Sequence, residues 1–223
     1  MTRENLTQSI EDYLKVIYEL TLAEERATTN EIAERMGVAP ASVTGMLRRL
    51  AANEPPLLRY EKHRGVALTT AGRQVALEII RHHRLLELYL HERLGYSWDE
   101  VHDEADRLEH VISEALEERI AQELGDPLQD PHGDPIPTRE LSLPVHHWAR
   151  LSDLCAGQKA IVQQVANENP DLLRYLSSIG LVLQARLEVL DVSEFDGNLH
   201  LMIGDRRLVL GPAVTHHIFV EVL

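Results

Sequence analysis

The chain has 223 residues, of which 22 are Lys or Arg and 36 are Asp or Glu, so its formal net charge is −14. Hydrophobic residues make up 44% of the chain, which excludes a disordered tail. No apolar stretch reaches the roughly 18 residues that span a membrane, and the polar first residues lack the apolar centre of a signal peptide. The only cysteine, Cys155, excludes an internal disulfide and any site built from several cysteines. We therefore expect a cytoplasmic protein without a membrane partner, in which any metal site uses imidazole and carboxylate groups.

The amino-terminal third predicts a winged helix-turn-helix. Apolar side chains recur at helical spacing in three segments, which are residues 7–22, 28–36 and 39–51. Gly37 follows the second segment as a turn residue, and Pro40 suits the first turn of the third. Two short apolar stretches, 57–60 and 66–69, then flank a charged turn and predict a β-hairpin that would serve as the wing.

The distribution of charge favours DNA as the partner of this region. Residues 28–84 carry nine Lys or Arg and five Asp or Glu, a balance of +4, whereas the remaining residues sum to −18. Small and hydroxyl-bearing residues on the exposed face of the third helix would allow close approach to a groove, and arginines would reach phosphates. The alternative is a winged helix that contacts another protein. The predicted DNA-contacting residues are Ala39, Ala41, Ser42, Thr44, Gly45, Arg48 and Arg49 on the helix and Lys62, His63 and Arg64 on the wing.

The middle of the chain predicts two long helices followed by a loop. The first helix covers about residues 70–94 and the second about 98–124, and four prolines in 127–137 then exclude a regular element. From about residue 151 the apolar period changes to that of strands, with five short segments at 159–165, 181–190, 199–203, 207–210 and 218–222. Five short strands in about 70 residues suggest a small barrel.

Metal-binding side chains recur at helical spacing in the second of these helices. His102, Asp106, Glu109 and His110 share one helix face, and His83 and Glu87 form a further pair four residues apart on the preceding helix. These groups would converge if the two helices pack antiparallel, while the alternative is a solvated acidic face. His82, His91 and His132 have no evident partners and are expected to be surface or capping residues.

Six motifs, in order and at matching spacing, resemble the metal-dependent repressors of the diphtheria-toxin-repressor and manganese-transport-regulator type. The motifs are IEDYLKVIYEL, IAERMGVAPASVT, YEKHRGVALTTAGR, HHRLLELYL, VHDEADRLEHVIS and PHGDPIP, which cover about residues 6–140. The last 70 residues resemble the SH3-like, or FeoA-like, domain of the longer members. The resemblance implies a mainly α protein with a β carboxyl-terminal domain. It would have a winged helix-turn-helix (1–74), a helical dimerisation and metal-binding domain (75–145) and a small SH3-like β-barrel (152–223).

The resemblance also implies two metal sites. The primary site would use Asp12, Asp106, Glu109 and His110, and the ancillary site would use His83, Glu87 and His102. Glu168 or Asp171 in the third domain would complete the ancillary site. Lys15 stands where manganese-type members have a carboxylate, and a protonated lysine is not a ligand, which argues against two closely paired manganese ions.

These features predict a transcriptional repressor that controls metal-ion homeostasis and is not an enzyme. Oxygen ligands with one imidazole and no sulfur suit Mn²⁺, with Fe²⁺ as the alternative. The metal would fix a homodimer for binding to palindromic operator DNA. Two other functions remain open at this point: a winged-helix regulator that senses a small organic ligand without a metal switch, and a metallohydrolase.

Overall fold

The computed structural model describes residues 6–22, 25–144, 146–166 and 169–223. The chain divides into two compact units. The first comprises Met1–His82, Glu109–Ile112 and Pro137–Ser142, and the second comprises His83–Leu108, Ser113–Ile136 and Leu143–Leu223. Helix α4 (Thr70–Leu94) contributes residues to both units.

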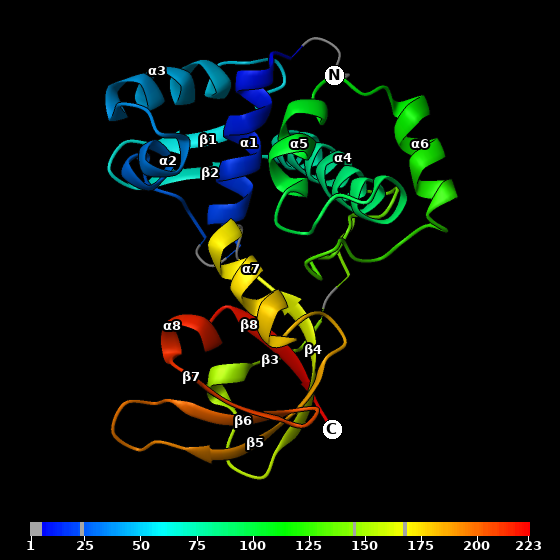
Figure 1. The fold of residues 1–223 in the computed structure, drawn as a ribbon. Coiled ribbons are helices and arrows are strands. Elements are labelled where there is room, and N and C mark those ends of the chain that lie inside the picture. The colour runs from blue at the N-terminus through cyan, green and yellow to red at the C-terminus, as the bar shows by residue number, and fades with distance from the viewer. Residues whose placement is uncertain (1–5, 23–24, 145, 167–168) are drawn as a thin grey trace. The chain divides into compact units, whose positions relative to one another are not determined.

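The first unit contains the expected winged helix-turn-helix (Figure 1). Its elements are α1 (Gln8–Leu20), α2 (Thr29–Met36), α3 (Pro40–Ala51), β1 (Leu58–Glu61) and β2 (Gly65–Leu68). The strands pair antiparallel, from Leu58 with Leu68 to Glu61 with Gly65. The three helices bury one stripe each, with Leu14, Ile32 and Leu47 fully inaccessible to solvent.

Local signals in the sequence define the ends of α2 and α3. The Thr28 hydroxyl accepts a hydrogen bond from the Glu31 backbone N–H while the Glu31 carboxylate accepts one from the Thr28 N–H, which completes a capping box. Gly37 ends α2 in the left-handed conformation, with φ of 65°, and Pro40 begins α3. The turn between the two helices is therefore short and fixed.

The helical part of the second unit differs from the sequence-based expectation. The single helix expected over 98–124 is wrong, because the structure has α5 (Val101–Leu108) and α6 (Glu114–Glu123) instead. Ser113 caps α6 by accepting a hydrogen bond from the Leu116 N–H. Of the five residues between the helices, the first four, Glu109–Ile112, belong to the first unit.

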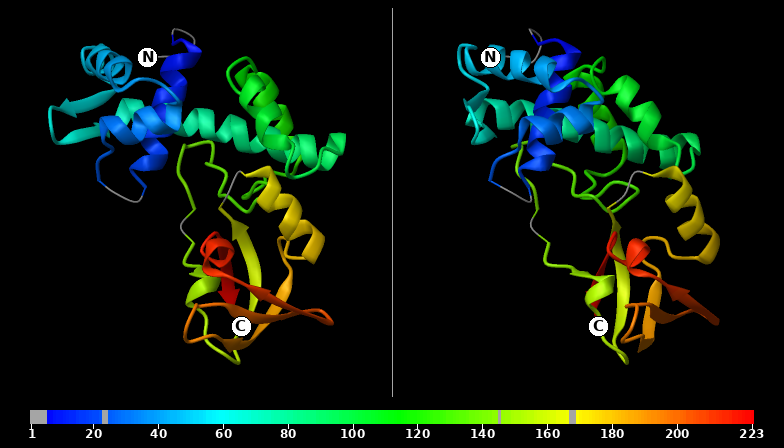
Figure 2. Two further views of the ribbon diagram at one scale, coloured as in Figure 1. Left: turned by 60° about the vertical axis from the view of Figure 1, so that its left-hand side comes forward. Right: turned by 90° about the vertical axis from the view of Figure 1, so that its left-hand side faces the viewer.

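The carboxyl-terminal sheet is antiparallel throughout and has the strand order β3-β8-β4-β5-β6-β7. Its strands are β3 (Ala149–Arg150), β4 (Lys159–Val165), β5 (Arg186–Val192), β6 (Leu199–Ile203), β7 (Arg206–Leu210) and β8 (Ile218–Val222). A short 3₁₀ helix (Leu151–Asp153) follows β3, and α8 (Pro212–Thr215) precedes β8. Figure 2 shows the twist of this sheet from two further directions. The result agrees with the expected SH3-like domain.

Two details of this sheet correct the sequence-based expectation. Helix α7 (Pro170–Ile179) was not expected, although Asn169 caps it and Gly180 ends it in the left-handed conformation. The strand expected over 181–190 begins only at Arg186. Its alternating apolar pattern starts earlier because Leu181, just after α7, is itself fully buried in the core beneath the sheet.

Candidate metal centre

The first group of side chains that could hold a metal ion, termed here the first cluster, consists of Asp12, Glu109 and His110. Asp12 lies on α1, and the other two follow the end of α5. His110 Nε2 lies 2.8 Å from Asp12 Oδ1 and 3.2 Å from Glu109 Oε1. One ligand atom from each residue lies within 4.8 Å of the others. The structure thus brings together three of the four residues predicted for the primary site, across almost one hundred positions of sequence.

A third carboxylate, that of Glu11, contacts the other nitrogen of the His110 ring. Glu11 is 4% exposed, and its Oε2 lies 2.6 Å from His110 Nδ1. Carboxylates that bind the far nitrogen of a ligating histidine fix the orientation of the ring, so Nε2 is left to face the cluster. Glu11 was not among the residues predicted from the sequence. A signal for Glu11 was present in the sequence. Glu11 lies three residues before Leu14 and seven before Tyr18, on the buried apolar stripe of α1, where a carboxylate is unexpected.

The electrostatics of the first cluster reflect an excess of carboxylates. Burial lowers the pKa of His110, but its contacts with Asp12, Glu109 and Glu11 outweigh burial and raise that pKa to about 11. Lys15 adds a further positive charge, with its Nζ 2.8 Å from Glu109 Oε2. In the metal-free chain, an imidazolium and an ammonium therefore balance the carboxylates.

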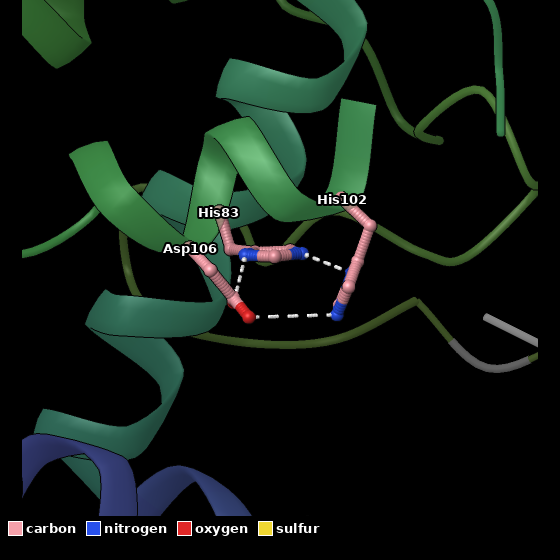
Figure 3. A group of neighbouring side chains, drawn as sticks. All are labelled: His83, His102 and Asp106. Atoms are coloured by element: carbon pink, nitrogen blue, oxygen red, sulfur yellow. Dashed lines mark hydrogen bonds and ion pairs between the residues drawn. The ribbon is translucent and has the colours of Figure 1, made fainter. Parts of the chain in front are cut away.

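The second cluster consists of His83 and Glu87 on α4 and His102 and Asp106 on α5. Figure 3 shows His83, His102 and Asp106 pointing toward one another from the two helices. His83 Nδ1 lies 3.2 Å from Asp106 Oδ1, and His102 Nε2 lies 3.6 Å from Asp106 Oδ2. Asp106, which the family resemblance assigns to the primary site, thus contacts the two histidines assigned to the ancillary site. Its place in the primary site stays a prediction.

Glu87 completes the second cluster from a buried position. Its Oε1 lies 3.0 Å from His83 Nε2 and 3.2 Å from His102 Nδ1, and the residue is 2% exposed. Burial raises the pKa of Glu87, but the neighbouring imidazoles of His83, His102 and His132 outweigh burial and hold that pKa well below its usual range. Glu87 is therefore a carboxylate in the metal-free chain.

The remaining predicted ligands come from the third domain. Glu168 lies outside the described residues. Asp171 is the second residue of α7, and the Oδ1 of its exposed side chain accepts a hydrogen bond from Arg174 at 2.6 Å. The assignment of either residue to the ancillary site stays a prediction.

Two histidines that were predicted from the sequence to be surface or capping residues are buried. His82 is inaccessible to solvent, and its Nδ1 donates to the backbone carbonyl of Glu109 at 3.1 Å, which anchors the first cluster. His132 is 6% exposed and faces Glu87. The expectation was wrong because their partners come from distant segments. His91 does act at a helix end, where its Nδ1 donates to the Tyr96 carbonyl at 2.8 Å.

Most of the predicted DNA-contacting residues, on α3 and at the turn of the wing, are exposed. On α3, Thr44 is half-buried and its hydroxyl donates to the Pro40 carbonyl. At the wing, one side of the turn is fixed by Arg64, whose guanidinium lies 3.3 Å from Glu61. The exposed members are Ala39, Ala41, Ser42, Gly45, Arg48, Arg49, Lys62, His63 and Arg64. Their exposure among the described residues is what contact with a DNA groove requires, and their role stays a prediction.

The donor set of the first cluster fits a divalent cation. Two carboxylates and one imidazole are oxygen and nitrogen ligands of the kind that Mn²⁺ and Fe²⁺ accept, and sulfur is absent from the cluster. His110 is oriented by Glu11, as ligating histidines commonly are. The second cluster offers the same donor types.

Comparison with known proteins gives the same picture. Residues 5–66 match the description "Iron dependent repressor, N-terminal DNA binding domain", residues 69–138 match "Iron dependent repressor, metal binding and dimerisation domain", and residues 149–222 match "FeoA domain". The iron-dependent repressor IdeR of Mycobacterium leprae is 32% identical over 97% of this chain and 98% of its own length. The regulator MntR of Oceanobacillus iheyensis is 36% identical over 48% of this chain and 71% of its own length.

Solved structures are similar over nearly the whole chain. A manganese-dependent transcriptional repressor in complex with manganese is 40% identical, with a TM-score of 0.86 over 96% of this chain and all of that one. The manganese regulator SloR is 32% identical, with a TM-score of 0.76 over 97% and 99% of the two chains. Among the described residues, none of the helices has the length and apolar character needed to cross a membrane. The chain belongs to the diphtheria-toxin-repressor family of metal-dependent transcriptional repressors.

Proposed function

We propose that this chain is a manganese-responsive repressor that binds operator DNA as a homodimer, with Fe²⁺ as the alternative metal. The observation that carries the proposal is the first cluster, in which Asp12 lies on α1 while Glu109 and His110 follow α5. The oxygen and nitrogen donors of this cluster suit Mn²⁺, and the ligand that α1 contributes, Asp12, is an oxygen donor. The ammonium group of Lys15 forms an ion pair with Glu109 beside the cluster, and a second cation would have to lie close to this charge. We therefore propose one metal ion in this cluster.

The residues of the cluster have separate roles. Asp12, Glu109 and His110 would hold the ion, Glu11 orients His110, and His82 fixes the Glu109 backbone. A bound cation supplies the positive charge that neutralises the clustered carboxylates. The proton on His110 must leave when Nε2 becomes a ligand, and Glu11 remains on Nδ1 to keep the ring in place.

Helix α1, which carries Asp12 of the first cluster, also supports α3, the predicted recognition helix. Helix α1 packs against α2, and α2 packs against α3. Tyr13, the neighbour of Asp12, lines a cleft together with Ser42, Gly45 and Arg49 of α3. A fixed position of Asp12 therefore fixes the support of the recognition helix, so an ion that binds the DNA-competent arrangement more tightly shifts the population toward it.

The three-domain division, with 1–74 for DNA binding, 75–145 for dimerisation and metal binding and 152–223 as the SH3-like domain, is part of this proposal. So is a palindromic operator, because a two-fold symmetric dimer presents two recognition helices related by the same symmetry. We infer a regulator rather than an enzyme, because the family consists of repressors. A switch by an organic ligand is not favoured, because the relatives are named for iron or manganese.

Conservative substitutions in the first cluster test the proposal. We would measure Mn²⁺ affinity and Mn²⁺-dependent retention of DNA for Asp12→Asn and Glu109→Gln, with Glu34→Gln on an exposed face of α2 as the control. The two cluster variants should require at least about tenfold more Mn²⁺ for DNA retention, since each loses a charged ligand. The proposal fails if both variants retain DNA at the Mn²⁺ concentration that suffices for the control.

A further inference from the structure

His132 connects the second cluster to the carboxyl-terminal sheet. It lies in the loop that contains the PHGDPIP motif, and it is one of three buried ligand-type residues, with Glu87 and Asp130, that approach one another within 4.8 Å. Asp130 is committed elsewhere, because its Oδ1 accepts hydrogen bonds from the backbone N–H groups of His132 and Asp134 and its Oδ2 lies 3.8 Å from Arg84. The group is therefore a structural bridge and not a further cation site.

The two ring nitrogens of His132 face different parts of the second unit. Nε2 lies 2.7 Å from the carbonyl oxygen of Trp98, and since a carbonyl only accepts, Nε2 carries the hydrogen. Nδ1 lies 3.7 Å from Glu87 Oε2, the oxygen opposite the one that contacts His83 and His102. The ring therefore sits directly behind a residue of the second cluster.

Trp98 carries this connection into the core beneath the sheet. Its indole is stacked on the His132 ring, with centroids 5.9 Å apart and planes at 24°. The same indole is buried with residues of the sheet and of α7, among them Val165 and Leu173. A movement of the His132 ring would thus disturb the packing of the carboxyl-terminal core.

The backbone around His132 is bonded to the sheet as well. The Val165 N–H of β4 donates to the His132 carbonyl at 2.8 Å. Gly133 approaches β4 so closely that a Cβ there would lie 2.1 Å from the Gln163 carbonyl oxygen. The Gln164 amide donates to Asp134 at 2.8 Å. The loop is therefore held against β4 on both sides of His132.

We propose that His132 is a positioning residue of the second metal cluster, which orients Glu87 and couples metal binding there to docking of the carboxyl-terminal domain. This inference rests on the metal-dependent function proposed above and extends it, because it takes the second cluster as a further metal site. Coupling of this kind is reciprocal. A docked domain holds Glu87 in place for the metal, and the metal, by holding Glu87, stabilises the docked domain.

Two substitutions at His132 separate its contacts. His132→Gln places an amide near the depth of Nε2, so it keeps a donor for the Trp98 carbonyl while it loses the contact with Glu87. His132→Ala loses both contacts. We would titrate full-length protein with Mn²⁺ in a Glu109→Gln parent, in which the first cluster is weakened, with His200→Gln on the exposed face of β6 as the matched control. Circular dichroism would verify that each variant folds. If His132→Ala does not fold, the Mn²⁺ affinity of His132→Gln alone tests the proposal.

Both His132 variants should bind Mn²⁺ about 10–100-fold more weakly than the parent, the usual loss when a partner of a metal ligand is removed. The control should match the parent. Mn²⁺ should also slow hydrogen exchange of the β4 amides in the parent, and this slowing should disappear in His132→Ala.

Mn²⁺ affinity within twofold of the parent in His132→Gln, or equal slowing of β4 exchange in His132→Ala, would overturn the coupling while the second site stands. A parent that binds no Mn²⁺ would overturn the second site and the coupling together. Mn²⁺-dependent DNA retention by the unsubstituted chain, measured alongside, shows separately whether the proposed function holds.

Discussion

The imidazole of His110 shows how single residues prepare the first cluster. Its two nitrogens are held by Glu11 on one side and by Asp12 and Glu109 on the other. The ring therefore needs no reorientation to present Nε2 to an ion, only the loss of a proton. Such preorganisation lowers the cost of binding.

The contact between Glu11 and His110 can be tested by substitution. Glu11→Gln should weaken Mn²⁺ binding by about 10–100-fold, because the neutral amide orients the ring less strongly and adds less to the basicity of His110. Competition titration in a His102→Gln background, which weakens the second cluster, would measure it. Glu34→Gln serves as the control. Equal affinities for the two variants would show that Glu11 does not act on the site.

The raised pKa of His110 predicts a pH dependence of metal binding. In the metal-free fold this pKa is about 11, against an ordinary value of 6.5, so a proton must be released for each ion bound. Mn²⁺ affinity should rise about tenfold for each pH unit between about pH 6.5 and 8.5, where one bound proton is displaced. Titrations at three pH values in the His102→Gln background would measure the slope, and a flat profile would contradict the assignment of His110 as a ligand.

The raised pKa of His110 affects the stability of the metal-free fold in the opposite direction from metal affinity as the pH rises. Because the folded pKa of His110 lies above its unfolded value, the charged ring stabilises the metal-free fold fully below about pH 6.5, and this contribution is lost as the pH rises toward 11. Metal affinity therefore increases with pH over a range in which the metal-free fold gradually loses stability.

At the scale of elements, the helix-turn-helix was predictable because its signals are local. Thr28, Gly37 and Pro40 act on the residues beside them, and the apolar stripes of the three helices fix which faces are buried. The break between α5 and α6 was not predictable, because the helical spacing of the apolar and the metal-ligating residues continues through Glu109 and His110. Their contacts with α1, nearly one hundred residues away, draw this segment out of the helix.

The capping box of α2 gives a prediction for the DNA-binding domain. Thr28→Ala should lower the free energy of unfolding by about 1 kcal/mol, because the N–H of Glu31 loses its acceptor. Urea denaturation would measure the change. Thr29→Ala, one position inside the helix and outside the cap, is the matched control and should be nearly neutral. Equal losses in both variants would contradict the role of the cap.

The loop against β4 gives a second prediction at this scale. Gly133 and Gly157 both have positive φ, 87° and 86°, but a Cβ at Gly157 meets no atom within 4 Å. Gly157→Ala should therefore cost only about 1–2 kcal/mol of backbone strain. Gly133→Ala should cost clearly more, because its Cβ collides with the Gln163 carbonyl. Equal urea midpoints for the two variants would contradict the close approach of this loop to β4.

For the whole molecule, the sequence predicted the order of the winged helix-turn-helix, the helical segment and the carboxyl-terminal sheet better than the elements and contacts within them. The change from helical to strand spacing near residue 151 marked the carboxyl-terminal sheet correctly. Helix α7 was missed because Leu172, Leu173 and Leu176 lie among short strand-like segments. The roles of Glu11 and His132 were missed for a related reason: each is a lone polar residue whose partner comes from another part of the chain.

Metal-dependent DNA binding is tested most directly by selecting genomic DNA fragments with the purified protein in the presence of Mn²⁺, of Fe²⁺ without oxygen, or of a chelator. We expect specific fragments to be recovered with Mn²⁺, fewer with Fe²⁺, and none with chelator, because in the proposed function a cation bound at the first cluster fixes Asp12 and α1. Recovery of the same fragments at equal yield in chelator would contradict it, since DNA binding would then not depend on the metal.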